Sequence, residues 1–153
     1  MNPLELEHYL HEHIPLSAAM QVTVLEASPA QVRLAAPLAP NINHRRTVFG
    51  GSAAAVATLA AWALLHLRLT AEGFAGRLVI RRSEMDFEQA IAGEFEAEAT
   101  APGDERWQRF RSAVARGRPA RIEMRATLSF AGARAGAFIG QFVALPAHER
   151  NDR

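Results

Sequence analysis

One long apolar run constrains the fold of this chain more than any other feature. Between Ala53 and Leu65 the only polar side chain is that of Thr58, and no charge interrupts the run. His66 and Arg68 end this run, which is therefore shorter than the stretch of about 20 apolar residues that a membrane span needs. A helix that is apolar on nearly every face must be enclosed by protein. We therefore predict a central helix that the rest of the chain surrounds.

Length and composition limit what can enclose this helix. The chain has 153 residues, which suits one domain but not two. We predict a single domain over residues 1–147, with the central helix at 51–70, followed by a polar tail at 148–153. The chain has no cysteine, which excludes disulfides, cysteine nucleophiles and thiolate metal sites. The formal net charge of +1 gives no reason to expect nucleic acid or a membrane as a partner.

The first residues predict a short helix over 3–13. Asn2 can cap it, Pro3 suits its first position, and Glu5 can complete a capping box. The chain does not open with a charged and then apolar segment, so we expect a cytoplasmic protein.

Three histidines lie in this first helix, at positions 8, 11 and 13. No acidic residue or further histidine is placed with them to complete a ligand set. We interpret them as ordinary helix side chains, and we expect no metal and no cofactor.

Strand-like runs occur on both sides of the central helix, in pairs separated by turn signals. These runs cover residues 20–27, 31–37, 77–88, 94–100, 122–130 and 135–145. In the run at 94–100, apolar residues alternate with three glutamates, which predicts a strand with one solvent-exposed face. We expect each pair to form a hairpin, the middle pair around Ala92-Gly93.

The remaining element is a short amphipathic helix that Asp104 can cap. It carries Trp107 and Phe110, and Gly117 ends it. Together the elements predict an α+β fold. A curved antiparallel sheet of about six strands, wrapped around the central helix, would bury that helix on all sides.

The segment just before the central helix carries the chemistry. Residues 41–52 form a polar loop that runs through the pair Gly50-Gly51 into the helix. Glycine lets a ligand approach the backbone closely, because no Cβ stands in the way. The first N–H groups of a helix lack internal partners and carry partial positive charge. A developing oxyanion could be held there, so the pattern favours acyl chemistry.

The order of elements and the motif Asn-x-x-x-x-x-Phe-Gly-Gly-Ser at residues 43–52 resemble the hot-dog-fold acyl thioesterases. More narrowly, residues 36–44, 47–52 and 61–62 resemble the YiiD-type thioesterase domain, and the resemblance extends over residues 14–145. It implies the hot-dog fold and hydrolysis of an acyl-CoA or acyl-carrier-protein thioester. Hot-dog domains place their sites between protomers, so it also implies a homodimer or a dimer of dimers.

The resemblance implies roles for particular residues. The N–H groups of the glycine pair would hold the thioester oxygen, and Asn43 would orient water or the thioester. Many relatives carry an Asp or Glu one to two turns after the glycine pair. This chain has Thr58 there, and no carboxylate between Ser52 and Glu72. A threonine hydroxyl has no useful basicity at neutral pH, so the base comes from elsewhere, activity is weak, or the reaction differs.

Two places in the sequence offer such a base. His44 lies in the loop, and its imidazole titrates near neutrality. The run at 77–88 offers Glu84 and Asp86. Alternation along that strand directs Ser83 toward the cavity and leaves the two carboxylates facing solvent, unless a bulge reverses the assignment.

Other residues near the loop would contact the substrate. Ser52 either caps the helix or bonds the ligand; we do not favour it as a nucleophile, because Gly-x-Ser-x-Gly is absent. Thr58 either bonds the carbonyl one turn back or takes part in the chemistry. Arg45 and Arg46 are best placed for the phosphates of a pantetheine carrier. The predicted substrate contacts are Phe49, Ser52, Trp62, Arg45, Arg46, Glu84 and Asp86.

The sequence thus predicts an acyl thioesterase in which the glycine pair supplies the oxyanion donors. Asn43 orients the reactants, and Thr58 with His44 or Ser83 holds the attacking water. One alternative is a non-hydrolytic acyl-thioester binding or regulatory domain, which the missing helix carboxylate favours. Another is a hydroxyacyl-thioester dehydratase, which needs a histidine and an acidic residue in one cavity.

Overall fold

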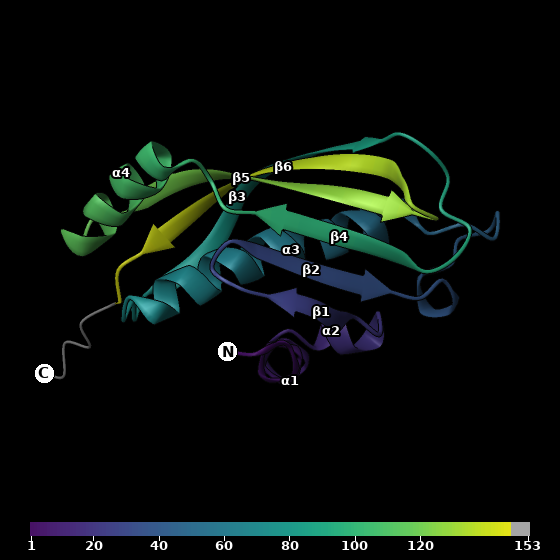
Figure 1. Cartoon of the computed structure of the whole chain (residues 1–153), viewed down its shortest axis with the longest axis horizontal. Helices are drawn as coiled ribbons and strands as arrows, with labels where there is room; N and C mark the ends of the chain where they lie inside the picture. Colours follow the sequence, from purple (N-terminus) through teal and green to yellow (C-terminus); the bar gives the residue numbers. More distant parts are fainter. Residues whose placement is uncertain (148–153) are drawn as a thin grey trace, which may run out of the picture.

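Figure 1 shows the computed structural model of the chain, which describes residues 1–147. The helices are α1 (Pro3–His13), α2 (Pro15–Ala19), α3 (Gly50–Ala71) and α4 (Asp104–Ala115), with a 3₁₀ turn η1 (Ala39–Asn41). The strands are β1 (Thr23–Ala27), β2 (Gln31–Ala36), β3 (Arg77–Phe87), β4 (Phe95–Thr100), β5 (Ala120–Phe130) and β6 (Ala133–Leu145). The predicted tail at 148–153 lies outside the described residues.

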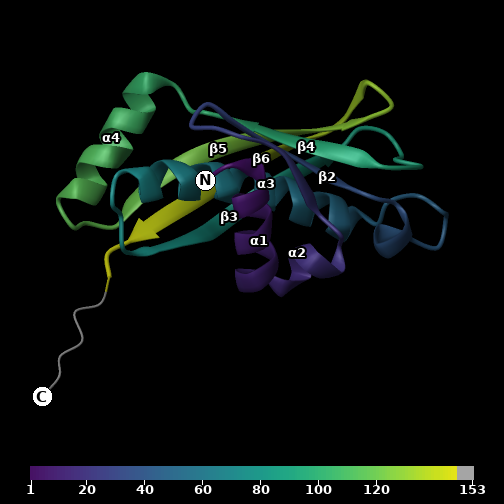
Figure 2. The same cartoon turned by 60° about the horizontal axis from the view of Figure 1, so that its bottom comes forward.

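The six strands of the described chain form one antiparallel sheet, in the order β1-β2-β4-β5-β6-β3. The sheet curves around α3, which packs against β2, β3, β4, β5 and β6 (Figures 1 and 2). The predicted α+β architecture, a curved antiparallel sheet wrapped around a central helix, is confirmed.

The central helix is enclosed, as its composition requires. Val56, Ala57, Leu64 and Leu65 are fully buried. By length and composition alone α3 could cross a membrane, but 61% of its apolar window is buried inside the fold. That burial is typical of a core helix. The sheet can approach α3 closely because many of its core side chains are alanines.

The predicted pairing of the two middle strands is wrong. β3 pairs with β6 at one edge of the sheet, whereas β4 lies between β2 and β5. Residues 88–94 therefore cross from the edge to the middle of the sheet instead of forming a hairpin turn. This crossing is tied to the loop before α3, because the Val48 N–H donates to the Ile91 carbonyl at 2.8 Å. The turn signal at Ala92-Gly93 is local, and it carries no information about which strands become neighbours.

The two outer helices differ in how they begin. Asn2 and Glu5 cap α1 reciprocally, each side chain accepting from the other residue's N–H. In α4 the capping position belongs to Gly103, and Asp104 is the first helical residue without a side-chain cap bond, so the predicted cap is wrong. Its charge still complements the positive end of α4. Pro15 both follows α1 and begins α2, so β1 starts three residues later than predicted.

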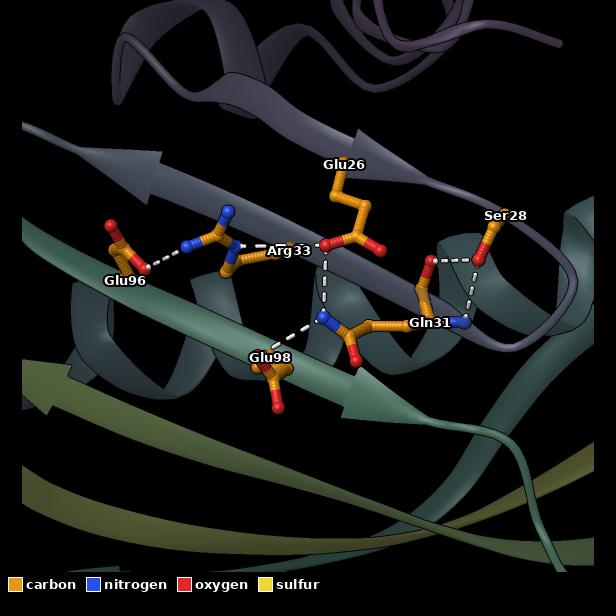
Figure 3. A network of polar contacts seen from close by, with 6 residues as sticks. All are labelled: Glu26, Ser28, Gln31, Arg33, Glu96 and Glu98. Carbon is orange, nitrogen blue, oxygen red and sulfur yellow. Dashed lines mark hydrogen bonds and ion pairs between the residues drawn. The ribbon is translucent and has the colours of Figure 1, made fainter.

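The sheet face turned away from α3 is polar along β1, β2 and β4. Arg33 on β2 forms ion pairs with Glu26 of β1 and Glu96 of β4, at 4.0 and 3.3 Å (Figure 3). Gln31 Nε2 donates to Glu26 and to Glu98. These contacts tie the edge strand β1 to its neighbours, and they give β4 the predicted wet face.

The opposite edge of the sheet is long and open. β3 has 11 residues, and it exposes the apolar side chains of Val79, Ile80 and Phe87 beside several arginines and carboxylates. An exposed edge strand of this length presents unpaired backbone groups to any second strand that approaches. The two edges of the sheet thus differ in length.

Candidate active site

The loop before α3 is organised by Asn43. Its Oδ1 accepts from the N–H groups of Arg45 and Thr47 at 2.8 and 3.1 Å, and its Nδ2 donates to Thr47 Oγ1 at 3.0 Å. Ile42 and Val48 close the loop with a β-bridge. Bonds from an asparagine side chain to the backbone two residues on are typical of an Asx turn. The amide of Asn43 is therefore engaged within the loop that it shapes.

A second asparagine, Asn41, anchors the same loop to the core, and sequence analysis gave it no role. Its side chain is buried, and its Nδ2 donates to the carbonyls of Met20 and Pro37 at 3.0 and 2.8 Å. Its own carbonyl accepts from the Phe49 N–H at 2.7 Å. Asn41 therefore fixes where α3 begins. Its place directly after a proline, at the entry to the loop, was the signal that could have found it.

The start of α3 presents free donors. Phe49 occupies the N-cap position without a side-chain cap bond, and its carbonyl accepts from Ala53 N–H at 3.1 Å. The N–H groups of Gly50, Gly51 and Ser52 come before this first intrahelical donor, so they have no acceptor within the helix. Ser52 is the third helical residue, and the predicted capping role for it is wrong.

Two phenylalanines lie against the glycine pair. A Cβ at Gly51 would clash with the ring of Phe49, and a Cβ at Gly50 would lie 3.4 Å from Phe87 Cζ. Both rings are largely exposed, Phe49 at 58% and Phe87 at 60%, and Gly51 itself is exposed. The rings therefore flank the free N–H groups, while a ligand can still reach the backbone from outside.

A cavity of about 330 Å³ opens beside Gly50. Its walls come from the loop before α3, the first turn of α3, the crossing after β3 and the ends of β5 and β6. Glu88 is the one ionisable residue among those that line it. The sequence pattern predicts no role for Glu88, because it makes this residue the last position of a strand. We call this space the polar cavity, after Glu88 and Gln89, while the rest of its lining is apolar.

Arg134 holds the carboxylate of Glu88 at two points. Arg134 Nε lies 2.9 Å from Oε2, and Nη2 lies 2.9 Å from Oε1. The hydrogen bond and the negative charge of Glu88 raise the pKa of Arg134. The carboxylate is thus fixed in direction by an exposed arginine, which is not itself among the residues that line the cavity.

A second cavity, of about 250 Å³, lies further along α3 and is here called the apolar pocket. Its lining is apolar except for Thr58. At 1.5 Å per residue, Thr58 lies about 12 Å from Gly50 along the helix axis. The Thr58 hydroxyl donates to the Ala54 carbonyl at 2.8 Å, which is the self-satisfied alternative. Trp62 also lines the pocket, and its Nε1 donates to the Leu78 carbonyl at 3.1 Å. The pocket suits an apolar group.

Stacked rings from α1 and α3 follow Trp62. The ring centroids of Trp62 and His66 are 4.8 Å apart, those of His66 and Tyr9 are 4.5 Å apart, and His13 meets Tyr9 edge-on at 4.2 Å. Burial, and the nearby His13, lower the pKa of His66. Its Nε2 is buried and has no hydrogen-bond partner among residues 1–147. A neutral His66 therefore suits this stack, which holds α1 against α3.

The predicted residues of β3 fall on two faces of the sheet. The bulge between Ile80 and Arg82 lies before Ser83, so alternation beyond it is kept and Ser83 lies on the side of α3. Glu84 and Asp86 lie on the opposite face and are exposed. Within one chain they are not brought to the glycine pair.

The charged residues of the loop do not line the polar cavity. His44, Arg45 and Arg46 are exposed, and Arg45 Nε donates to His44 Nε2 at 3.4 Å. None of the three is among the residues that line the polar cavity. The structure therefore brings together the glycine pair, Phe49 and Ser52, and it keeps the predicted base His44 apart from them.

Known proteins share this fold. The family model described as "Putative thioesterase (yiiD_Cterm)" matches residues 4–146. The solved structure of a putative thioesterase from Shewanella oneidensis is 27% identical, with a TM-score of 0.84, over 94% of this chain and 97% of that one. A protein of unknown function from Chlorobaculum tepidum is 26% identical, with a TM-score of 0.89, over 95% and 97%.

A more distant structure extends the comparison. A thioesterase from Haemophilus influenzae is 10% identical, with a TM-score of 0.77, over 99% of this chain and 95% of that one. At that identity the likeness concerns the fold alone. The hot-dog architecture is thus common to all three structures.

Proposed function

The chain belongs to the family of putative thioesterases described as YiiD_C, and we propose that it hydrolyses an acyl-CoA or acyl-carrier-protein thioester at the start of α3. One observation carries this proposal. Free N–H groups beside the polar cavity and an apolar pocket occur along the same helix. A thioester has a carbonyl oxygen for the first and an apolar chain for the second.

In this proposal the N–H groups of Gly50 and Gly51 hold the thioester oxygen. The oxygen of a water molecule bonds to the carbonyl carbon, and the carbonyl electron pair moves onto oxygen. The donors and the positive end of α3 stabilise the resulting oxyanion. The carbon–sulfur bond then breaks, and the thiolate takes up the proton that the base removed from water.

We propose Glu88 as that base. It lines the same cavity as Gly50 and supplies the carboxylate that α3 lacks. Its contact with Arg134 keeps the carboxylate directed while it accepts and returns the proton. Thr58 fits this role less well, because its hydroxyl is bonded within α3.

The other predicted residues take supporting roles. Asn43 shapes the loop that leads into the glycine pair, since its amide bonds within that loop. Ser83, on the side of β3 that faces α3, suits a contact to the attacking water. Arg45 and Arg46 are exposed beside the loop and suit the phosphates of CoA or of a carrier arm.

We also propose that two chains associate through β3, as a dimer or within a dimer of dimers. The open edge of β3, with the exposed apolar side chains of Val79 and Ile80, supports this, and Phe87 at its end lies against Gly50. A second chain on this edge would therefore border the glycine pair. Light scattering should give the mass of at least two chains, and Val79→Lys should lower it. A wild-type mass of one chain would contradict the association.

A non-hydrolytic acyl-thioester binding domain is the second candidate. The two-point contact between Glu88 and Arg134 favours it, because that contact occupies the carboxylate that hydrolysis needs. A dehydratase fits less well, since no histidine is among the described residues that line the polar cavity.

Release of free thiol from acyl-CoA substrates separates these candidates. A thioesterase releases thiol, and its turnover should fall sharply in Asn43→Ala because the loop loses its organising bonds. A binding domain raises its melting temperature with the thioester and releases no thiol. A dehydratase adds or removes water at a double bond, again without free thiol.

A further inference from the structure

We propose that the apolar pocket binds the acyl chain, and that Trp62 together with the α1–α2 segment (residues 3–20) limits this chain to about the length of a dodecanoyl group. The inference rests on the proposed function and adds to it the substrate class and the residues that select it. Three properties of the pocket carry it: its position on α3, the chemistry of its lining, and its fixed end.

The apolar pocket lies on the same face of α3 as the glycine pair. Gly51, Ala55, Thr58 and Trp62 are separated by four, three and four residues, the spacing that keeps side chains on one helix face. At 1.5 Å per residue, Trp62 lies about 16 Å beyond Gly51 along the helix axis. An acyl group whose carbonyl lies at the glycine pair can therefore extend along this face into the pocket.

β3 meets α3 at both ends of this face. Phe87, at the end of the strand, lies against Gly50, and Ile80 lines the pocket. Leu78 accepts the hydrogen bond from Trp62. The same strand therefore contacts α3 beside the proposed reaction centre and again at the pocket.

The lining of the pocket suits a saturated chain of limited length. Leu59 and Phe142 come from the core, and Ile14, Leu16 and Met20 come from the α1–α2 segment. The one hydroxyl in the lining, that of Thr58, already has its acceptor. The volume of about 250 Å³ corresponds to roughly eight groups of the size of a water molecule, at about 30 Å³ each. Ala55, where the pocket begins on α3, lies about 6 Å beyond Gly51 along the helix axis, a distance that about four further carbons span. A chain much longer than about twelve carbons would have to leave the pocket.

Trp62 forms a fixed end to the pocket. Its Nε1 is bonded to the Leu78 carbonyl, and its ring stacks on His66 at an interplanar angle of 9°. His66 in turn stacks on Tyr9 of α1. Trp62 cannot turn aside without breaking the hydrogen bond and the stack, so it would set chain length in the way a rigid wall does.

The outer wall offers the best place to change the pocket. Leu16 is 57% exposed, so a larger side chain there does not disturb the core. Leu4 on α1 is 65% exposed and is not part of the lining, which makes it a matched control position. Trp62 can be altered as well, but its substitution also removes a hydrogen bond that holds the fold.

Binding of non-hydrolysable S-alkyl-CoA thioethers to the full chain tests the inference without any need for turnover. Each additional buried methylene group should lower the dissociation constant about fourfold. By isothermal titration, dodecyl-CoA should bind at least tenfold more tightly than butyl-CoA, and hexadecyl-CoA no more tightly than dodecyl-CoA. Affinity that is independent of chain length, or that keeps rising to hexadecyl-CoA, would overturn the inference.

Two variants locate the length limit. Leu16→Trp should weaken dodecyl-CoA at least tenfold and butyl-CoA by less than twofold, whereas Leu4→Trp should leave both affinities at the wild-type values. Trp62→Leu should let hexadecyl-CoA bind more tightly than dodecyl-CoA, with circular dichroism to show that the variant folds. If Trp62→Leu does not fold, Leu16→Trp decides alone, and an unchanged length profile in that variant overturns the inference.

The inference and the proposed function fail in different ways. Thiol release with no chain-length optimum for thioether binding leaves hydrolysis standing and overturns the pocket assignment. A clear optimum at dodecyl-CoA with no thiol release supports the pocket assignment and removes hydrolysis.

Discussion

The two cavities along α3 differ in what they offer a ligand. The polar cavity is lined by Gly50, at the start of the helix with its free N–H groups, and by Glu88. The apolar pocket has a single hydroxyl, on Thr58, which is bonded within the helix. One helix therefore separates an end where charge can develop from a middle where a chain can be buried. This separation means that reaction and substrate selection can be altered one at a time.

Gly51→Val should produce the largest effect, and it acts on the polar cavity alone. The valine side chain displaces the exposed ring of Phe49 and stands over the N–H groups of the glycine pair, so the thioester oxygen can no longer approach these donors closely. Loss of one such donor lowers kcat by roughly 100- to 1,000-fold, measured as thiol release. Gly103→Ala is the control, because a Cβ there meets nothing within 4 Å. Near wild-type turnover in Gly51→Val would contradict the assignment of the oxyanion site.

Glu88→Gln should have the next largest effect, again confined to the polar cavity. Removal of a general base lowers kcat by about 100-fold or more, while KM for dodecanoyl-CoA should change little because the acyl chain binds elsewhere. Glu105→Gln, on the exposed face of α4, is the matched control. A loss seen in KM and not in kcat would assign Glu88 to binding.

Acid should lower the stability of the fold through His66, whose ring belongs to the stack between α1 and α3. Burial and His13 lower the pKa of His66 below its ordinary value of 6.5. Between pH 6.5 and the lowered pKa, His66 binds a proton in the unfolded chain but not in the folded chain. The free energy of unfolding therefore falls as the pH drops from 6.5 toward the lowered pKa. The melting temperature should therefore fall less steeply with acid in His66→Phe, which keeps the ring stack, than in the wild type.

The control for this pH effect is His8→Phe, on the exposed side of α1. It should keep the wild-type slope of melting temperature against pH. Equal slopes in the wild type and in His66→Phe would show that His66 does not couple the stack to pH.

Thr58→Val should have the smallest effect, and it acts on the apolar pocket. A methyl group replaces a hydroxyl that is bonded only to Ala54, so dodecyl-CoA should bind about two- to fourfold more tightly by isothermal titration. A loss of tenfold or more in kcat would instead give Thr58 the catalytic role that its place in the sequence suggested.

Local patterns in the sequence predicted much of the fold. The apolar run of α3 identifies an enclosed helix because burial on every face leaves no position for charge. Alternation predicted the wet face of β4, and it placed Ser83 on the side of α3. The first and last hairpins were found for the same reason, since their strands are neighbours both in sequence and in the sheet.

What the sequence missed depends on contacts between distant segments. β3 crosses to the far edge of the sheet, and this crossing brings Glu88 to the polar cavity, where Arg134 of β6 holds it. No spacing or motif near Glu88 encodes that meeting. Asn41 was missed likewise, because its buried partner is the carbonyl of Met20, which lies 21 residues earlier in the chain.

The most direct test is the structure of the protein with an S-(2-oxotetradecyl)-CoA ketone, which carries a carbonyl but cannot be hydrolysed. We expect that the ketone oxygen accepts hydrogen bonds from the N–H groups of Gly50 and Gly51. Its alkyl chain should follow α3 and end against Trp62. A ketone oxygen bound away from the start of α3, or an alkyl chain that leaves the apolar pocket empty, would contradict the account.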